Sequence, residues 1–380
     1  MAIQLDKIQG IETPFYYYDK KVLEETLETI KSELTRHNDY HLHYAIKANA
    51  NIDVLRVIKK AGFGVDAVSG GEIQRALDAG FAPEKIVYAG VGKADWEINL
   101  GLDAGIFCFN VESLEELNII NSLAAAKDKT ASVCFRINPN VGAHTHANIT
   151  TGLAENKFGI AMDDMETAVK AAVALSNIDF IGLHFHIGSQ ILEMGDFEAL
   201  CVRINELQDR LEEQGITVKN INVGGGLGID YNDPDGHPIP DFRKYFDTYA
   251  NGLKLRSGQQ MHFELGRAVV GQMGSLITQV LYVKHAQVKQ FAIVDAGMSD
   301  LIRPALYGAH HVIQNLTSSE PEEVYDVVGP ICESSDVFGK AEHLPQCRRG
   351  DLIALRSAGA YGEIMACQYN CRKLPKAYLI

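Results

Sequence analysis

The chain has 380 residues, and its 35 lysines and arginines against 49 aspartates and glutamates give a net charge of −14. This acidity disfavours binding to nucleic acid or to an anionic membrane surface, because no local basic stripe offsets the repulsion. Hydrophobic residues make up 46% of the chain without any apolar run near the roughly 20 residues of a membrane span, which indicates a globular protein of two domains or of one large barrel with an addition.

The first three-quarters of the chain alternate between β-rich and helical patterns. A β-rich segment at 11–18 comes first, and Asp19 then caps a helical pattern over residues 20–34. The further strands that we expect are 41–46, 63–68, 86–89, 106–110, 132–137, 180–186, 221–223 and 262–264. The helices expected between them are 52–61, 71–79, 94–103, 113–125, 163–175, 194–214 and 241–255. Eight β/α units predict an α/β protein with a (β/α)8 barrel of the TIM type.

A doubly wound open sheet is the alternative to the barrel, and the glycine-rich segment 224–228 weighs against it. This segment follows the seventh strand and not the first, and it does not fit Gly-x-Gly-x-x-Gly because Ile229 and Tyr231 interrupt the spacing. In barrels, the loops after strands seven and eight often bind phosphate through backbone N–H groups. The segment therefore favours a barrel with a phosphate site.

The pattern changes after residue 266. The β-rich runs 269–283, 291–295, 324–328, 352–356 and 364–369 follow one another with little helix between them. We expect a cofactor-binding barrel over residues 20–266 and a mostly antiparallel β domain, formed by 1–19 and 267–380, that completes the substrate site.

The cysteines and the first residues indicate the compartment. The seven cysteines are scattered without any Cys-x-x-Cys pair, which favours free thiols over a disulfide framework or a zinc knuckle. The first six residues lack the basic segment and apolar core of a secretion signal. We expect a cytoplasmic protein.

In a barrel, catalytic side chains project from the C-terminal ends of the strands. The candidates there are Lys47, Asp66, Tyr88, Asn110, Arg136, His186, the 224–226 loop and Glu264. Pyridoxal phosphate needs a lysine for its aldehyde, N–H donors for its phosphate and a carboxylate at its pyridine nitrogen. Lys47, the glycine loop and Glu264 match these needs, and we expect Asp66 and Arg136 among the cofactor-binding residues.

Two histidines of one strand suggest a metal site at first sight. His184 and His186 alternate onto the same face, but no third ligand at a strand end is evident. An imidazole at position 186 can instead stack on a cofactor ring, and Ser189 can bond a phosphate oxygen. We therefore expect no metal, and we interpret His144 and His146 as solvated loop residues.

The chain resembles the pyridoxal-phosphate-dependent decarboxylases of the alanine-racemase-like barrel type over nearly its whole length. The resemblance rests on motifs in a fixed order, namely Tyr44-Ala-Ile-Lys47-Ala-Asn, Phe63-Gly-Val-Asp66 with Ser69, Thr151-Gly-Leu-Ala-Glu-Asn-Lys-Phe-Gly159, His184 to Gln190, Gly224-Gly-Gly226, Glu264-Leu-Gly-Arg267, Asp300-Leu-Ile-Arg303-Pro-Ala-Leu-Tyr307, Gly329-Pro-Ile-Cys332-Glu333-Ser-Ser-Asp336 and Ala360-Tyr361-Gly. One departure is Leu265, where the family commonly has proline.

The resemblance implies a Schiff base at Lys47, His186 stacked on the cofactor and Glu264 at the pyridine nitrogen. It implies phosphate contacts from Ser189, Gly225, Gly226, Gly266 and Arg267. It further implies that Arg267, Arg303 and Tyr307 bind a distal carboxylate of the substrate, that Glu333 binds its distal ammonium, that Tyr361 contacts cofactor or substrate and that Cys332 delivers a proton.

The implied reaction is decarboxylation of meso-2,6-diaminopimelate to L-lysine and CO₂, the last step of lysine biosynthesis, in a homodimer whose active site lies at the interface. Decarboxylation of carboxynorspermidine, ornithine or arginine is the alternative, and Arg303 with Tyr307 argues against it because those substrates lack a distal carboxylate. A non-catalytic cofactor-binding barrel and a metal-dependent barrel hydrolase are more distant alternatives.

Overall fold

The computed structural model describes residues 3–142 and 157–380, so His144, His146 and the first part of the 151–159 motif lie outside the described residues. The chain divides into two compact units. The barrel unit comprises Leu27–Gly228 and Asp241–Gly266. The β unit comprises Met1–Thr26, Ile229–Pro240 and Arg267–Ile380, so the loop 229–240, which we had assigned to the barrel, is grouped with the β unit.

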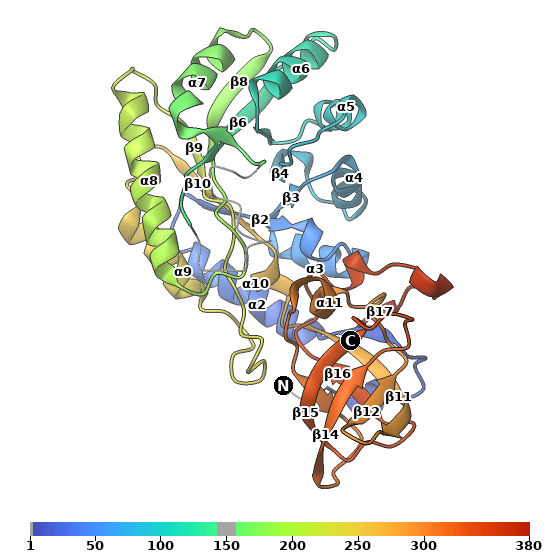
Figure 1. Cartoon of the computed structure of the whole chain (residues 1–380). Helices are drawn as coiled ribbons and strands as arrows, with labels where there is room; N and C mark the ends of the chain where they lie inside the picture. The colour runs from blue at the N-terminus through green and yellow to red at the C-terminus, as the bar shows by residue number, and fades with distance from the viewer. Residues whose placement is uncertain (1–2, 143–156) are drawn as a thin grey trace. The chain divides into compact units, whose positions relative to one another are not determined.

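Eight parallel strands close the barrel unit into a ring (Figure 1). They are β2 (Tyr40–Ala45), β3 (Gly64–Ala67), β4 (Ile86–Tyr88), β5 (Cys108–Val111), β6 (Ala131–Asn138), β8 (Ile178–His184), β9 (Asn220–Asn222) and β10 (Gln260–Leu265). The ring is complete because β10 pairs with β2 and β5 pairs with β6. The predicted (β/α)8 barrel is confirmed.

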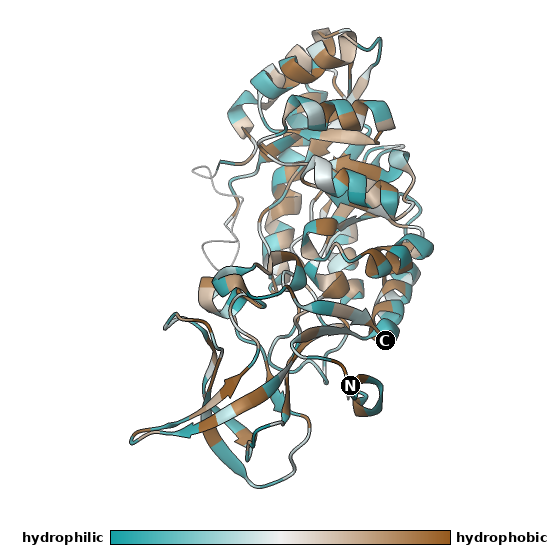
Figure 2. Ribbon diagram, turned by 90° about the vertical axis from the view of Figure 1, so that its right-hand side faces the viewer, coloured by the Kyte–Doolittle hydropathy of each residue, from teal (hydrophilic) through white to brown (hydrophobic). Residues whose placement is uncertain are grey.

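Helices cover the outside of the barrel. They are α3 (Ile52–Ala61), α4 (Gly70–Asp78), α5 (Asp95–Ala104), α6 (Leu114–Ala125), α7 (Met165–Ala174), α8 (Met194–Glu212) and α9 (Phe242–Gly252). Ser69 and Ser113 begin α4 and α6 by accepting backbone N–H groups three residues on. Figure 2 shows apolar and polar residues interleaved along the helices, as expected for helices with one buried face. Short elements of this unit are η1 (Ile46–Ala48), η2 (Pro83–Lys85), β7 (Ile160–Ala161) and η4 (Met162–Asp164).

The β unit contains a mostly antiparallel sheet. Its strands are β1 (Phe15–Tyr18), β11 (Gly274–His285), β12 (Gln290–Val294), β13 (Ile313–Asn315), β14 (Glu322–Val328), β15 (Val337–Pro345), β16 (Leu352–Leu355) and β17 (Lys376–Leu379). The first strand, β1, pairs antiparallel with β11 and parallel with β17. Its helices are α1 (Leu5–Ile8), α10 (Arg267–Val270) and α11 (Arg303–Tyr307), and α2 (Lys20–Leu34) crosses from one unit to the other.

Two strand predictions for the β unit are wrong in part. Residues 364–369 form no strand, because the chain there makes the short turns η5 (Glu363–Met365) and η6 (Tyr369–Cys371). Asn370 and Cys371, directly after the predicted strand, have φ values of 55° and 57°, so an extended chain cannot continue there either. The run 269–283 begins in helix α10, and its strand starts only at Gly274.

Among the residues that the structure describes, no helix is long and apolar enough to cross a membrane.

Candidate active site

The carboxylate of Glu264, near the end of β10, is the centre of a buried hydrogen-bond network. Asn110 and Asn222 donate to its Oε1 at 3.0 and 2.7 Å, and His184 Nε2 lies 2.9 Å from its Oε2. Burial alone would raise the pKa of Glu264, but its interactions with His184 and the charge of Lys47 lower it below the ordinary range. The carboxylate is therefore held as an anion inside the barrel.

Lys47 lies in η1, directly after β2, at the same end of the barrel. Its Nζ is 3.9 Å from Oδ2 of Asp66 on β3, and 39% of the lysine side chain is exposed, against 1% for Asp66. Burial and the nearby charge of Glu264 raise the pKa of Asp66. Its Oδ1 is buried without a hydrogen-bond partner among the described residues. A buried acceptor next to a reachable amine is a place where a ligand can supply the missing donor.

The glycine loop after β9 lies against the end of β10. A Cβ added at Gly225 would lie 2.0 Å from the carbonyl oxygen of Glu264, and one at Gly226, where φ is +110°, would lie 2.8 Å from the carbonyl oxygen of Gly188. Only glycine permits this approach. The N–H of Gly225 donates to His186 Nδ1 at 3.3 Å, whereas that of Gly226 forms no hydrogen bond within the described part of the chain.

His186 and Arg136 lie around the same end of the barrel. Burial and the positive charges of Lys47 and Arg136 lower the pKa of His186, which favours a neutral imidazole. The guanidinium of Arg136, on β6, forms an ion pair with Oε1 of Glu112 at 3.4 Å and lies 4.5 Å from the centre of the Phe158 ring. Arg136 is thus fixed by protein groups, and its positive charge acts on His186.

These residues fit pyridoxal phosphate. Lys47 provides an amine, Glu264 a fixed anion for a protonated ring nitrogen and His186 a neutral flat ring. Gly226 provides an N–H that has no partner among the described residues and could bind a phosphate oxygen. Ser189 lies between His186 and the glycine loop in the chain and is partly exposed. Gly266 lies close to η1, where an added Cβ would be 3.0 Å from Cβ of Ala48.

The β unit contains a pair of buried arginines. Arg267 begins α10 and Arg303 begins α11, each is 6% exposed, and each donates from Nη1 to the hydroxyl of Tyr231 at 2.6 Å. Burial and the adjacent charge of Arg267 lower the pKa of Arg303. Within the described residues, no carboxylate lies within ion-pair distance of Arg303. A buried guanidinium in this situation favours an anionic ligand.

Two tyrosines lie close to these arginines. The guanidinium of Arg267 lies 4.9 Å from the centre of the Tyr361 ring. Tyr307 ends α11, four residues after Arg303, so both side chains leave the same face of the helix. Arg267, Arg303, Tyr231 and Tyr361 thus form one cluster of the β unit, and Tyr307 lies one helical turn after Arg303.

Cys332 and Glu333 are held by a different segment. The Cys332 N–H donates to Oδ1 of Asn370 at 3.1 Å, and the Tyr369 hydroxyl donates to Oε1 of Glu333 at 2.6 Å. Cys332 is exposed. The expected pairing of Arg303 with Glu333 about one substrate is not tested within this chain, and no ion pair joins the two side chains in the described residues.

Sequence reasoning missed the residues that support the site. Tyr231, which joins the two arginines, and Glu112, which fixes Arg136, had no assigned role, and Asn222 was not considered. Asn222 could have been found, because an Asn in a buried three-residue strand requires a polar partner. Tyr231 could not have been found, because its loop lies between two barrel segments in the sequence and is grouped with the β unit only in the structure.

The described residues contain no group of three or more His, Cys, Asp or Glu side chains that could hold a metal ion.

Comparisons with known proteins agree on one family. The sequence model of one protein family, described as "Pyridoxal-dependent decarboxylase, pyridoxal binding domain", matches residues 20–271. The chain is 67% identical over 374 residues to diaminopimelate decarboxylase of Bacteroides thetaiotaomicron, covering 98% of this chain and 97% of the relative. It is 41% identical to the Neisseria meningitidis enzyme of the same name over 98% of this chain and 90% of the relative. A crystal structure of diaminopimelate decarboxylase from Helicobacter pylori complexed with L-lysine matches with a TM-score of 0.92 at 40% identity, covering 98% of this chain and 93% of that one. The similarity therefore includes both units.

Proposed function

The chain belongs to the pyridoxal-dependent decarboxylases, within them to the diaminopimelate decarboxylases, and on this basis we propose how its residues divide the work. It is a pyridoxal-phosphate-dependent carboxy-lyase that converts meso-2,6-diaminopimelate to L-lysine and CO₂. When bound, pyridoxal phosphate supplies an electron sink for the electron pair left behind as CO₂ departs.

The barrel unit would hold the cofactor. Lys47 would bind it through its amine, and Glu264, kept anionic by three donors, would hold the proton on the ring nitrogen. His186, kept neutral by burial and by nearby cations, would stack on the ring without competing for that proton. We propose phosphate contacts from Ser189, Gly225, Gly226, Gly266 and Arg267, and supporting roles for Asp66 and Arg136.

The β unit would bind the distal end of the substrate. The single observation that supports this assignment is the environment of Arg303. Its guanidinium is buried, shares the Tyr231 hydroxyl with Arg267 and has no carboxylate partner among the described residues. A distal carboxylate would complete it, with Tyr307 and Tyr361 beside it, whereas a polyamine precursor would leave the charge buried and unpaired.

We propose a homodimer in which Cys332 and Glu333 of one chain complete the site of the other. Glu333 would bind the distal ammonium of the substrate. The thiol of Cys332 or the amine of Lys47 would return a proton to the carbon that loses CO₂. A cytoplasmic location is part of the proposal, and the free state of all seven cysteines supports a reducing compartment.

The deciding experiment compares substrates. The cofactor-loaded protein is assayed for CO₂ release from meso-diaminopimelate, ornithine, arginine and carboxynorspermidine under the same conditions. Turnover of meso-diaminopimelate alone supports the role of Arg303. Turnover of a polyamine precursor instead would keep the cofactor assignment and overturn the distal-carboxylate assignment.

A second experiment tests Lys47. Lys47→Ala should abolish turnover, while Lys60→Ala, an exposed lysine near the end of α3, should retain it. Wild-type activity in the Lys47→Ala protein would refute the mechanism.

A further inference from the structure

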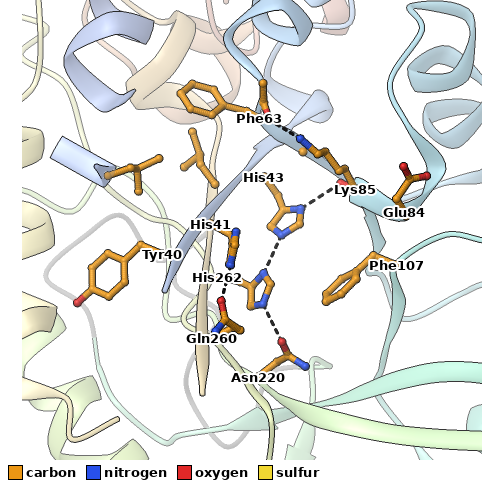
Figure 3. A pocket seen from close by; sticks show the side chains of 14 residues that line it. Tyr40, His41, His43, Phe63, Glu84, Lys85, Phe107, Asn220, Gln260 and His262 are labelled. Carbon is orange, nitrogen blue, oxygen red and sulfur yellow. Dashed lines mark hydrogen bonds between the residues drawn. The ribbon is translucent and has the colours of Figure 1, made fainter. Parts of the chain in front are cut away.

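A second cavity lies at the opposite end of the barrel from Lys47 and Glu264. It has a volume of about 320 Å³ and lies at the N-terminal ends of six barrel strands (Figure 3). Its lining residues include Tyr40 and His41 at the start of β2, Phe107 just before β5, and His262 near the start of β10. All of its lining residues belong to the barrel unit. The decarboxylation mechanism uses none of them.

Flat rings form much of the cavity wall. The ring of His262 lies 5.1 Å from that of His41, 5.2 Å from that of His43 and 5.2 Å from that of Phe107, measured between ring centres. The His262 ring stacks on the His41 ring and on the His43 ring, with an interplanar angle of 28° in each pair. The apolar side chain of Phe63 adds to the lining. Such a wall suits a ligand that carries a flat apolar ring.

A continuous row of hydrogen bonds runs along this wall. His43 Nδ1 lies 3.2 Å from the carbonyl oxygen of Lys85, and His43 Nε2 lies 2.9 Å from His262 Nδ1. His262 Nε2 lies 2.9 Å from Oδ1 of Asn220, whose Nδ2 donates to the carbonyl oxygen of Ile181 at 3.1 Å. Figure 3 shows the bonds from Lys85 through the two histidines to Asn220.

Both ends of this row are acceptors. The carbonyl of Lys85 requires an N–H on His43 Nδ1, because a carbonyl oxygen cannot donate. The Asn220 amide uses its Nδ2 for Ile181, so its Oδ1 faces His262 and requires an N–H on Nε2. If both rings are neutral, two bare nitrogens then face each other at 2.9 Å between His43 and His262. The row is complete only when the pair of rings carries one additional proton.

Burial opposes that proton. Loss of solvation lowers the pKa of His43 to about 4 and lowers the pKa of His262. Among the described residues, the charged and titratable groups that act on the pair are His41 on β2, Lys85 beside β4 and Glu264 deeper on β10, and Glu84 also lines the cavity. Lys85 and Glu84 carry opposite charges, and Lys85 Nζ already donates to the carbonyl oxygen of Gly62 at 2.9 Å. An anion in the cavity is therefore the missing contribution that would favour the proton.

We propose that this cavity is a second ligand site, for a small carboxylate that carries an aromatic ring, and that the carboxylate binds together with one proton taken up by the His43–His262 pair. The proton completes the row of hydrogen bonds, and the negative charge of the ligand offsets the charge that the proton brings. The site is independent of the decarboxylation reaction and of the residues assigned to it.

The test is calorimetric titration of the holoenzyme with benzoate, with benzamide as the neutral control of the same shape. Benzoate should bind, benzamide should bind at least about tenfold more weakly, and titrations in HEPES and in Tris at one pH should differ by the uptake of one proton. The affinity for benzoate should rise by up to about tenfold for each unit of pH decrease. Equal affinity for benzamide, or no proton uptake, would overturn the proposal.

Variants locate the binding. His262→Gln should remove the proton uptake and weaken benzoate binding, whereas His285→Gln, the same substitution at an exposed position of β11, should change neither. Repeating the wild-type titration with saturating L-lysine separates the two ends of the barrel. Benzoate that lysine displaces would be bound at the active site, and that result would refute the second site. The proton measurement on the wild-type protein remains decisive even if His262→Gln does not fold.

Discussion

His262 and Glu264 lie two residues apart on β10 and belong to networks of opposite character. Glu264 faces three side chains that can all donate, so its negative charge is satisfied within the protein. His262 belongs to a row whose two ends both accept, so neutral rings leave it one proton short. The same strand thus carries a fixed charge at the catalytic end and a variable charge at the other.

The difference lies in the neighbouring strand. Asn222 donates its amide N–H to Glu264, whereas Asn220, two residues earlier on β9, presents its amide oxygen to His262. One residue type serves both networks, and its orientation decides which charge the network can hold. A network whose donors and acceptors are all matched suits a cofactor that needs one protonation state. A network that lacks one proton suits a ligand that brings its own charge.

The largest expected effect comes from removing the fixed charge. Glu264→Gln keeps the size of the side chain but takes away the anion at the cofactor nitrogen. We expect kcat/KM for meso-diaminopimelate to fall by at least about a hundredfold. Glu213→Gln, at an exposed position after α8, is the matched control for the CO₂-release assay. Retained activity in Glu264→Gln would mean that the fully matched network has no catalytic purpose.

Next in size is the loss of one donor to that charge. Asn222→Leu leaves Oε1 of Glu264 with Asn110 as its remaining amide donor. We expect the free energy of unfolding in urea to fall by about 2 kcal/mol, because hydrogen bonds to buried charges contribute this much. Asn118→Leu, at an exposed position of α6, should change it by less than about 0.5 kcal/mol. Equal losses in the two variants would contradict the assignment.

The titration of His43, in the network with the variable charge, should be visible in the pH dependence of the free energy of unfolding. Burial lowers the pKa of His43 from 6.5 to about 4, so the folded chain binds fewer protons there than the unfolded chain does. His43 therefore does not lower the free energy of unfolding above pH 6.5. As the pH falls from 6.5 toward 4, the free energy of unfolding decreases by up to about 1.4 kcal/mol per pH unit. His43→Gln should flatten this part of the curve, and benzoate should do the same in the wild type. An unchanged slope in His43→Gln would locate the titration elsewhere.

The smallest effect would come from placing a permanent negative charge beside the His43–His262 pair. In Asn220→Asp, a carboxylate replaces the amide oxygen beside His262, so the histidine pair should hold its proton without a ligand. We expect its pKa, followed by the ring NMR signals, to rise by at least about one unit, and proton uptake on benzoate binding to disappear. Asn118→Asp on the surface is the control. Signals that do not move would show that the row does not govern the proton.

The barrel was predictable because its signal is local and repeated. Each β/α unit carries its own periodicity and caps, such as Ser69 and Ser113, so the eight strands and their helices could be located from the sequence. Glu264 and Lys47 could be selected because strand ends in a barrel share one face.

The remainder depends on contacts between distant residues. Residues 364–369 have a composition that favours a strand, but the turns η5 and η6 and the left-handed conformations of Asn370 and Cys371 replace it. The roles of Tyr231 and Glu112, and the direction in which Asn220 and Asn222 point, follow from partners on other elements. No local pattern encodes the proton that the His43–His262 pair lacks.

The route of the chain between its two units limits how they can be separated. The chain passes from one unit to the other after Thr26, after Gly228, after Pro240 and after Gly266. Neither unit is therefore encoded by one uninterrupted stretch of gene. No single truncation can remove the whole β unit and leave the barrel unit intact, because residues of the β unit lie at both ends of the chain and at 229–240. A barrel-only version would need a short linker in place of 229–240. A gene segment that encodes the barrel alone would therefore have to join Gly228 to Asp241 by a new connection.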